Sequence, residues 1–106
     1  MHDLANLRSL LAVAEAGAIT EAAHRLGLTQ PALTRRLQQL EAEFGTALLQ
    51  RGRNGATLTE AGQLVAAEAR TLVERFEATK REVARHTMAT GGTIRLGGGA
   101  TAVAFL

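Results

Sequence analysis

The sequence of 106 residues contains no cysteine, which excludes disulfide bonds, thiolate metal ligands and a cysteine nucleophile. No apolar run approaches the ~20 residues that a membrane-spanning helix requires, so we expect no membrane association. The N-terminal segment MHDLANLRSL lacks the basic-then-apolar order of a secretory signal. Together these absences predict a soluble protein of the reducing cytoplasm.

An excess of one charge is nearly absent as well, because the formal net charge is only +2. Affinity for phosphates depends on where basic side chains lie, so this total does not by itself indicate a nucleic-acid partner. His2, His24 and His86 are widely separated and join no acidic cluster. We therefore expect no metal site, no cofactor and no enzyme activity.

Apolar residues recur at three- and four-residue steps in three successive segments, which predicts three helices. The expected helices span residues 3–16, about 19–26 and about 30–44. Gly17 and Gly27 follow the first two segments and can end those helices. Only Gly27 and Leu28 separate the second helix from the residue that starts the third, so the turn between them is tight.

The third predicted helix has a defined start and two different sides. The hydroxyl of Thr29 can cap it, and Pro31 falls in the first turn, where a missing N–H costs nothing. Its inner side is apolar and consists of Leu33, Leu37, Leu40 and Phe44. Its outer side is mostly polar and carries Pro31, Thr34, Arg35 and Gln38, with Arg36 and Gln39 at the flanks. A tight turn followed by such a helix is typical of helix-turn-helix DNA-binding proteins.

Residues 48–58 predict two very short strands around an Asn54-Gly55 turn, with Arg51 and Arg53 on the hairpin. Thr59 can then cap a fourth helix that reaches about Met88. Its apolar residues alternate in steps of four and three, and include Val65, Ala69, Leu72, Phe76 and Val83. At 1.5 Å per residue this helix is about 45 Å long, too long to bury its apolar side against so small a domain. We therefore expect it to pair with a second chain.

The order AEAGAITEAAHRLGLTQPALTRRLQQLEAEFGTALLQRGRNGATLTEAG resembles the N-terminal winged helix-turn-helix of LysR-type transcriptional regulators. The distinctive pieces are the Ala22-Ala23 pair, TQPALTRRLQQLE, GTALLQR and LTEAG, in the order and spacing of that family. The sequence departs from the family at Ala18, where a capping serine is common, and at Leu49, where phenylalanine is usual. The resemblance extends over roughly residues 4–88.

The resemblance implies a mainly α fold in which three helices and a short β-hairpin wing precede a long dimerisation helix. The expected divisions are a winged helix-turn-helix domain at 1–58, the linker helix at 59–88, a hinge at 89–92 and the start of a truncated effector-binding domain at 93–106. A small-molecule effector is expected only in the full-length protein. The chain is expected to form a homodimer, with a tetramer as a further option for the full-length protein.

The resemblance and the side-chain chemistry together predict sequence-specific binding of double-stranded DNA, with the third helix in the major groove. Gln matches adenine, Arg matches guanine with two hydrogen bonds, and Thr offers a methyl group to thymine. The expected DNA-binding residues are Thr29, Gln30, Pro31, Thr34, Arg35, Arg36, Gln38 and Arg53. Arg36 is assigned to a phosphate, and Arg53 on the wing to the DNA backbone or the minor groove. A twofold dimer then predicts an interrupted inverted repeat as the target.

Other interpretations stay open at this point. Arg35 and Arg36 could form a solvated helix face paired with Glu41 or Glu43, and RGRNG could be an inert turn. The long helix could belong to a protein-interaction module that binds no DNA. Within the DNA-binding class, molybdate-responsive regulators share a similar winged domain.

Overall fold

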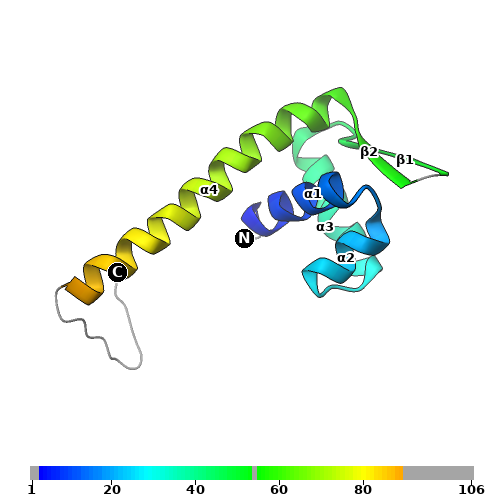
Figure 1. Ribbon diagram of the computed structural model, residues 1–106. Helices are drawn as coiled ribbons and strands as arrows, with labels where there is room; N and C mark the ends of the chain where they lie inside the picture. The colour runs from blue at the N-terminus through cyan, green and yellow to red at the C-terminus, as the bar shows by residue number, and fades with distance from the viewer. Residues whose placement is uncertain (1–2, 54, 90–106) are drawn as a thin grey trace. The chain divides into compact units, whose positions relative to one another are not determined.

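The computed structural model describes residues 3–53 and 55–89 of the chain. Its elements follow in the order α1 (Asp3–Ala16), α2 (Ile19–Leu26), α3 (Gln30–Phe44), β1 (Leu49–Gly52), β2 (Gly55–Leu58) and α4 (Glu60–Ala89) (Figure 1). The predicted mainly α, winged helix-turn-helix architecture with a long final helix is confirmed. The chain forms two units, residues 1–73 and residues 74–106. The expected start of the effector-binding domain at 93–106 and most of the expected hinge lie outside the described residues.

The core of the first unit forms where α1, α2 and α3 turn their apolar sides toward each other. α1 packs against both other helices and also contacts β2. The largest fully buried side chains are Leu10, Val13, Leu33, Leu37, Leu40, Leu48 and the hydroxyl-bearing Ser9. Burying each leucine stabilises the fold by about 1.5–3 kcal/mol. On α2 the buried residues are the small Ala22 and Ala23, which allow this short helix to approach its neighbours closely.

Phe44 is an exception to the predicted inner side of α3. Its side chain is 52% exposed, whereas Leu33, Leu37 and Leu40 are nearly inaccessible. Phe44 is the last residue of α3, one turn beyond Leu40, and lies beside Leu7 and Leu48 at the rim of the core. The apolar spacing therefore predicted the direction of the Phe44 side chain but not the point at which the core ends.

The expected helix boundaries are confirmed by their capping contacts. The Ala32 N–H donates to Thr29 Oγ1 over 3.2 Å, with Pro31 in the first turn of α3. Gly27 ends α2 in the left-handed conformation, with φ +69°, and its N–H bonds back to α2. Ala18 at the start of α2 makes no side-chain cap, as the missing serine leads one to expect. The helix-turn-helix segment is thus fixed locally at both ends of its turn.

The turn of the hairpin lies one residue earlier in the sequence than predicted. β1 and β2 pair antiparallel with Gly52 opposite Gly55, so Gly55 belongs to β2. Gly55 has a φ of +128°, and a Cβ atom on it would lie 2.2 Å from the Gly17 carbonyl oxygen. The adjacent Ala56 N–H donates to that same oxygen over 2.9 Å. Contact with the α1–α2 turn therefore holds Gly55 in the strand, and the predicted Asn54-Gly55 turn is wrong in register.

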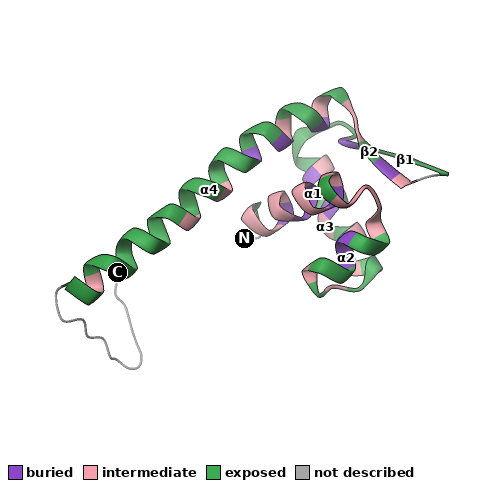
Figure 2. Cartoon of the chain, viewed as in Figure 1, coloured by how far each residue is buried: buried purple, intermediate pink, exposed green. Residues whose placement is uncertain are grey.

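The start of α4 is attached to the chain segment that leads into the wing. Thr59 Oγ1 accepts the Gly62 N–H over 2.9 Å, as predicted for a cap, and donates to the Ala47 carbonyl oxygen over 2.8 Å. The Thr59 N–H donates to the Leu48 carbonyl oxygen over 3.0 Å. Gly62 lies against that same carbonyl, where a Cβ atom would come within 2.0 Å of the oxygen. Buried positions on α4 are confined to Gly62, Ala66 and Ala69 (Figure 2).

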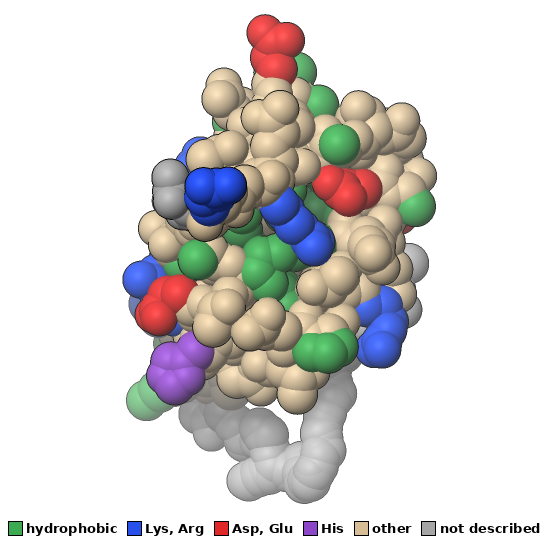
Figure 3. All heavy atoms as spheres, turned by 90° about the vertical axis from the view of Figure 1, so that its right-hand side faces the viewer, with side chains coloured by type: hydrophobic (Ala, Val, Ile, Leu, Met, Phe, Trp, Pro, Cys, Tyr) green, Lys and Arg blue, Asp and Glu red, His purple; other side chains and the backbone are tan. Residues whose placement is uncertain are grey.

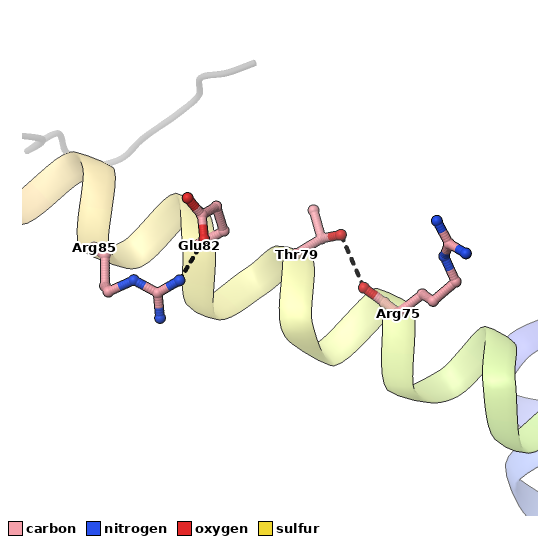
Figure 4. A network of polar contacts seen from close by, with 4 residues as sticks. All are labelled: Arg75, Thr79, Glu82 and Arg85. Carbon is pink, nitrogen blue, oxygen red and sulfur yellow. Dashed lines mark hydrogen bonds and ion pairs between the residues drawn. The ribbon is translucent and has the colours of Figure 1, made fainter.

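In the second unit, the described residues 74–89 continue α4, and side chains there contact one another along the helix itself. Thr79 Oγ1 donates to the Arg75 carbonyl oxygen over 2.8 Å, and Arg85 pairs with Glu82 (Figure 4). The Lys80 ammonium lies 5.3 Å from the centre of the Phe76 ring. Such exposed pairs at helical spacing contribute only tenths of a kcal/mol each. None of the described helices combines the length and apolarity that crossing a bilayer requires.

Replacing Gly62 by alanine should destabilise the protein, although alanine is ordinarily the better helix former. The added methyl group would overlap the Leu48 carbonyl oxygen, a backbone atom that cannot rotate away. We expect a loss of about 1–3 kcal/mol in the free energy of unfolding, measured by urea denaturation.

Gly52→Ala is the matched control, because a Cβ atom on Gly52 would have no neighbouring atom within 4 Å. A Gly62→Ala protein as stable as the Gly52→Ala protein would show that α4 does not pack as closely on Leu48 as described.

Candidate nucleic-acid interface

The N-terminal end of α3 projects from the domain because the turn before it is anchored. The Leu28 N–H donates to the Ala23 carbonyl oxygen over 2.9 Å, and the half-buried Leu28 side chain packs on the core. Thr29, Gln30 and Pro31 immediately after it are exposed. The Thr29 hydroxyl accepts the Ala32 N–H and retains its own proton for donation. The first turn of α3 is thus both fixed and accessible.

The predicted DNA-binding residues of α3 are accessible from its first turn to Gln38. Gln30, Arg35 and Gln38 are exposed, and Thr34 and Arg36 are half-buried. The buried leucines hold the opposite side against α1 and α2, so the orientation of these polar side chains follows from the core. The structure therefore leaves each of these predicted residues of α3 exposed or partly exposed.

Neither Arg35 nor Arg36 forms an ion pair within the described part of the chain. The alternative of pairing with Glu41 or Glu43 is not seen, and Glu41 Oε2 accepts the N–H groups of Leu48 and Leu49. The guanidinium donors of α3 are consequently available to an external acceptor.

Asn6 contacts α3 from within the core, and no sequence motif had drawn attention to it. Its side chain is only 3% exposed, and Asn6 Nδ2 donates to Gln39 Oε1 over 3.3 Å, linking α1 to α3. Asn6 Oδ1 is buried without a hydrogen-bond partner among the described residues. An amide on the apolar side of the first predicted helix was the available signal, because buried polar groups normally pair across elements.

The wing carries the remaining predicted DNA-binding residue. Arg53 lies at the end of the hairpin, and both Arg53 and Arg51 are exposed. A groove of about 790 Å³ runs between the hairpin and the α1–α2 turn. Its lining residues are Gly17, Gln50, Arg51, Gly52, Arg53, Gly55, Ala56 and Thr57. The arrangement places the Arg51 and Arg53 side chains beside a shallow groove that is otherwise lined by small or uncharged residues.

Basic side chains do not form a uniform patch on the face of the described residues that Figure 3 shows. On the face that contains α2 and the wing, Lys and Arg side chains are interspersed with acidic ones around a hollow with apolar side chains at its base (Figure 3). This agrees with the low net charge of the chain. Any selectivity for a polyanion must therefore come from individually placed side chains rather than from the overall field. In the described part of the chain, no three His, Asp or Glu side chains are grouped so as to hold a metal ion.

The predicted pairing side of α4 divides into covered and exposed residues. Ala69 is fully buried within its own chain and Val65 packs partly on the core, whereas Leu72, Phe76 and Val83 are 51%, 47% and 57% exposed. Leu64, outside the predicted stripe, is 71% exposed. It lines a groove of about 410 Å³ with Leu7, Phe44, Leu48 and Leu72. The exposed apolar surface of the first unit is therefore broader than the heptad pattern indicated.

The fold and the exposed side of α3 define a winged helix-turn-helix protein. The family model described as "Bacterial regulatory helix-turn-helix protein, lysR family" matches residues 4–63. The chain belongs to this family, as its resemblance implied.

Named relatives are consistent with this membership. The SDS degradation transcriptional activation protein of a Pseudomonas species is 40% identical over 99 residues, which are 93% of this chain and 32% of that protein. The HTH-type transcriptional regulator BudR of Raoultella terrigena is 52% identical over 61 residues, 58% of this chain and 21% of BudR. The chain thus spans about a third or less of the length of these relatives.

Two solved structures of DNA complexes superpose on the chain. The CbnR_DBD–DNA complex matches with a TM-score of 0.69 and 39% identity, covering 82% of this chain and 97% of that one. The BenM_DBD/benA site 1 DNA complex matches with a TM-score of 0.73 and 34% identity, covering 77% of this chain and 95% of that one.

Proposed function

We propose that this chain is the DNA-binding part of a bacterial transcriptional regulator and that it binds double-stranded DNA as a homodimer. The observation that carries the proposal is the capped start of α3, where Gln30 is exposed in the first turn and Thr34 and Arg35 follow on the side away from the buried leucines. The similarity to two domains solved with DNA supports the same conclusion. This is a binding function rather than a catalytic one, exercised in the cytoplasm, where bacterial DNA lies.

Each proposed contact follows from the donors and acceptors of the side chain. Gln30 and Arg35 can each form paired hydrogen bonds with a base edge, and Thr34 can present its methyl group to thymine. Pro31 adds a rigid apolar contact, and Thr29 and Gln38 border this surface. Arg36, half-buried at the flank, is better placed for a phosphate, and so is Arg53 on the wing.

The exposed apolar residues of α4 support pairing with a second copy. Leu72, Phe76 and Val83 are each about half exposed, which is unusual for large apolar side chains of a monomer at regular helical spacing. We assign residues 59–88 to the dimerisation helix and 1–58 to the DNA-binding domain. Two α3 helices related by a twofold axis would read an interrupted inverted repeat in successive major grooves.

The rest of the proposed organisation concerns the whole regulator. Residues 89–92 would act as a hinge, and residues 93–106 would begin an effector-binding domain that holds a small molecule in the full-length protein. A full-length regulator could join two dimers into a tetramer. The alternative function is a dimerisation or interaction module without DNA affinity, which the exposed Leu64 and Leu72 favour.

Selection from a pool of random duplexes distinguishes these two functions. We expect this chain to enrich an inverted repeat and to lose affinity as salt rises, because phosphate contacts release counterions. Affinity is measured for the enriched duplex at several salt concentrations, with sedimentation alongside. Dimers that show neither enrichment nor salt-dependent binding would support the interaction module instead.

Arg35→Ala and Arg36→Ala should affect DNA binding differently. Loss of a base contact should weaken binding to the enriched duplex more than to a random one, which is the result we expect for Arg35→Ala. Arg36→Ala should weaken both and reduce the slope of log affinity against log salt by about one. Circular dichroism checks that both variants are folded. Equal losses on both duplexes for the two variants would contradict this division of roles.

Leu72→Glu should shift the chain from dimer to monomer, because it places a charge on the apolar side of α4. Thr71→Glu is the matched control. Thr71 is exposed and precedes Leu72 in the sequence, so this substitution adds the same charge to α4 outside the predicted apolar stripe. Sedimentation at matched concentrations measures both variants. A Leu72→Glu protein that stays dimeric like the Thr71→Glu protein would show that another surface joins the chains.

A further inference from the structure

Glu41 binds backbone groups on both sides of the loop that follows α3. Its Oε2 accepts the Leu48 N–H over 2.8 Å and the Leu49 N–H over 3.2 Å. Its main-chain carbonyl oxygen accepts the N–H groups of Gly45 over 2.8 Å and Thr46 over 3.3 Å. One residue of α3 therefore fixes both the end of this helix and the start of the wing.

The position of the wing depends on the two residues that Glu41 binds. Leu48 is fully buried and Leu49 nearly so, and β1 begins at Leu49. From there β1 runs through Arg51 to Gly52, and Arg53 follows the end of the strand. The other strand is held separately, by the Ala56 N–H bond to the Gly17 carbonyl oxygen. Glu41 thus supplies the hydrogen bonds that join the start of β1 to α3, the helix that carries the proposed base contacts, beside the apolar packing of Leu48 and Leu49.

We propose that Glu41 is a positioning residue for DNA binding, which sets the wing relative to α3 so that Arg53 reaches the DNA when α3 occupies the major groove. This inference rests on the DNA-binding function proposed above. Glu41 itself need not touch the DNA. Its role is to hold Leu48 and Leu49 where the hairpin leaves the core.

The negative charge of Glu41 makes the inference testable, because the positioning role and the charge predict opposite changes in DNA affinity when Glu41 is replaced. A carboxylate on a DNA-binding helix repels phosphates, so removing it should strengthen binding if charge alone mattered. Loss of the two hydrogen bonds should release β1 and weaken binding. The two effects oppose each other. Glu43 supplies the matched control, because it is an exposed carboxylate two residues further along α3.

The first experiment compares four variants on the enriched duplex at fixed salt. We expect Glu41→Ala to bind about tenfold more weakly than the unchanged chain, as loss of one charged contact would predict. Glu43→Ala should bind as well or more tightly. Glu41→Gln keeps a carbonyl acceptor for the two N–H groups, so it should resemble Glu43→Gln. Equal affinities of Glu41→Ala and Glu43→Ala would overturn the proposal.

A double-mutant cycle with Arg53→Ala separates wing positioning from general loss of stability. If Glu41 acts through the wing, Glu41→Ala should add little to the loss already caused by Arg53→Ala. Independent effects would instead add, and additivity would overturn the proposal. Asn6→Ala, which removes a buried contact of α1 with α3, serves as the destabilised control and should remain additive with Arg53→Ala.

Amide hydrogen exchange of the DNA-free chain separates failure of this inference from failure of the proposed function. Exchange at Leu48 and Leu49 should accelerate in Glu41→Ala and stay slow in Glu41→Gln, relative to the buried amides of α1. Unchanged exchange would overturn the positioning role whatever the DNA result. If the chain without any substitution binds no duplex, the proposed function is overturned, and with it the DNA-binding role of Glu41. The exchange rates would still report whether Glu41 holds the wing.

Discussion

The peptide backbone at Leu48 is the point on which the first unit depends. Its N–H donates to the Glu41 carboxylate of α3, and its carbonyl oxygen accepts the Thr59 N–H and lies against Gly62 of α4. The Leu48 side chain is fully buried in the core. α3, the wing and the start of α4 therefore meet at one residue, through contacts with its backbone atoms. A shift of this peptide would move all three elements together.

Local rules predicted the elements and their ends because the relevant atoms are close in sequence. The Thr29 and Thr59 caps each bond to an N–H three residues away, and the apolar sides of the helices repeat within one or two turns. The outer side of α3 follows from the same periodicity, because Leu33 and Leu37 must face the core. The proposed site on α3 was thus readable from sequence as a surface, although its use by DNA stays a prediction.

What sequence reasoning could not supply was set by contacts between distant residues. Asn-Gly favours a two-residue turn, but the contact of Gly55 with the Gly17 carbonyl, far earlier in the sequence, keeps Gly55 in β2. Glu41 looked like a partner for the neighbouring arginines, yet two backbone N–H groups beyond the loop hold its carboxylate. Geometry of this kind appears only once the chain has folded, because spacing along one helix does not say which other element lies opposite.

The apolar residues of α4 fall into two groups, one buried within the chain and one exposed, which the heptad pattern alone does not distinguish. Gly62, Ala66 and Ala69 are small and buried, and small residues permit the close approach that places the start of α4 on the Leu48 carbonyl. Leu64 and Leu72 are large and exposed within the same unit. A partner that covered them would bind a segment attached directly to the Leu48 peptide. In a dimer joined through α4, the separation of the two α3 helices would therefore be constrained at this backbone junction, without any side-chain contact between α4 and the exposed side of α3.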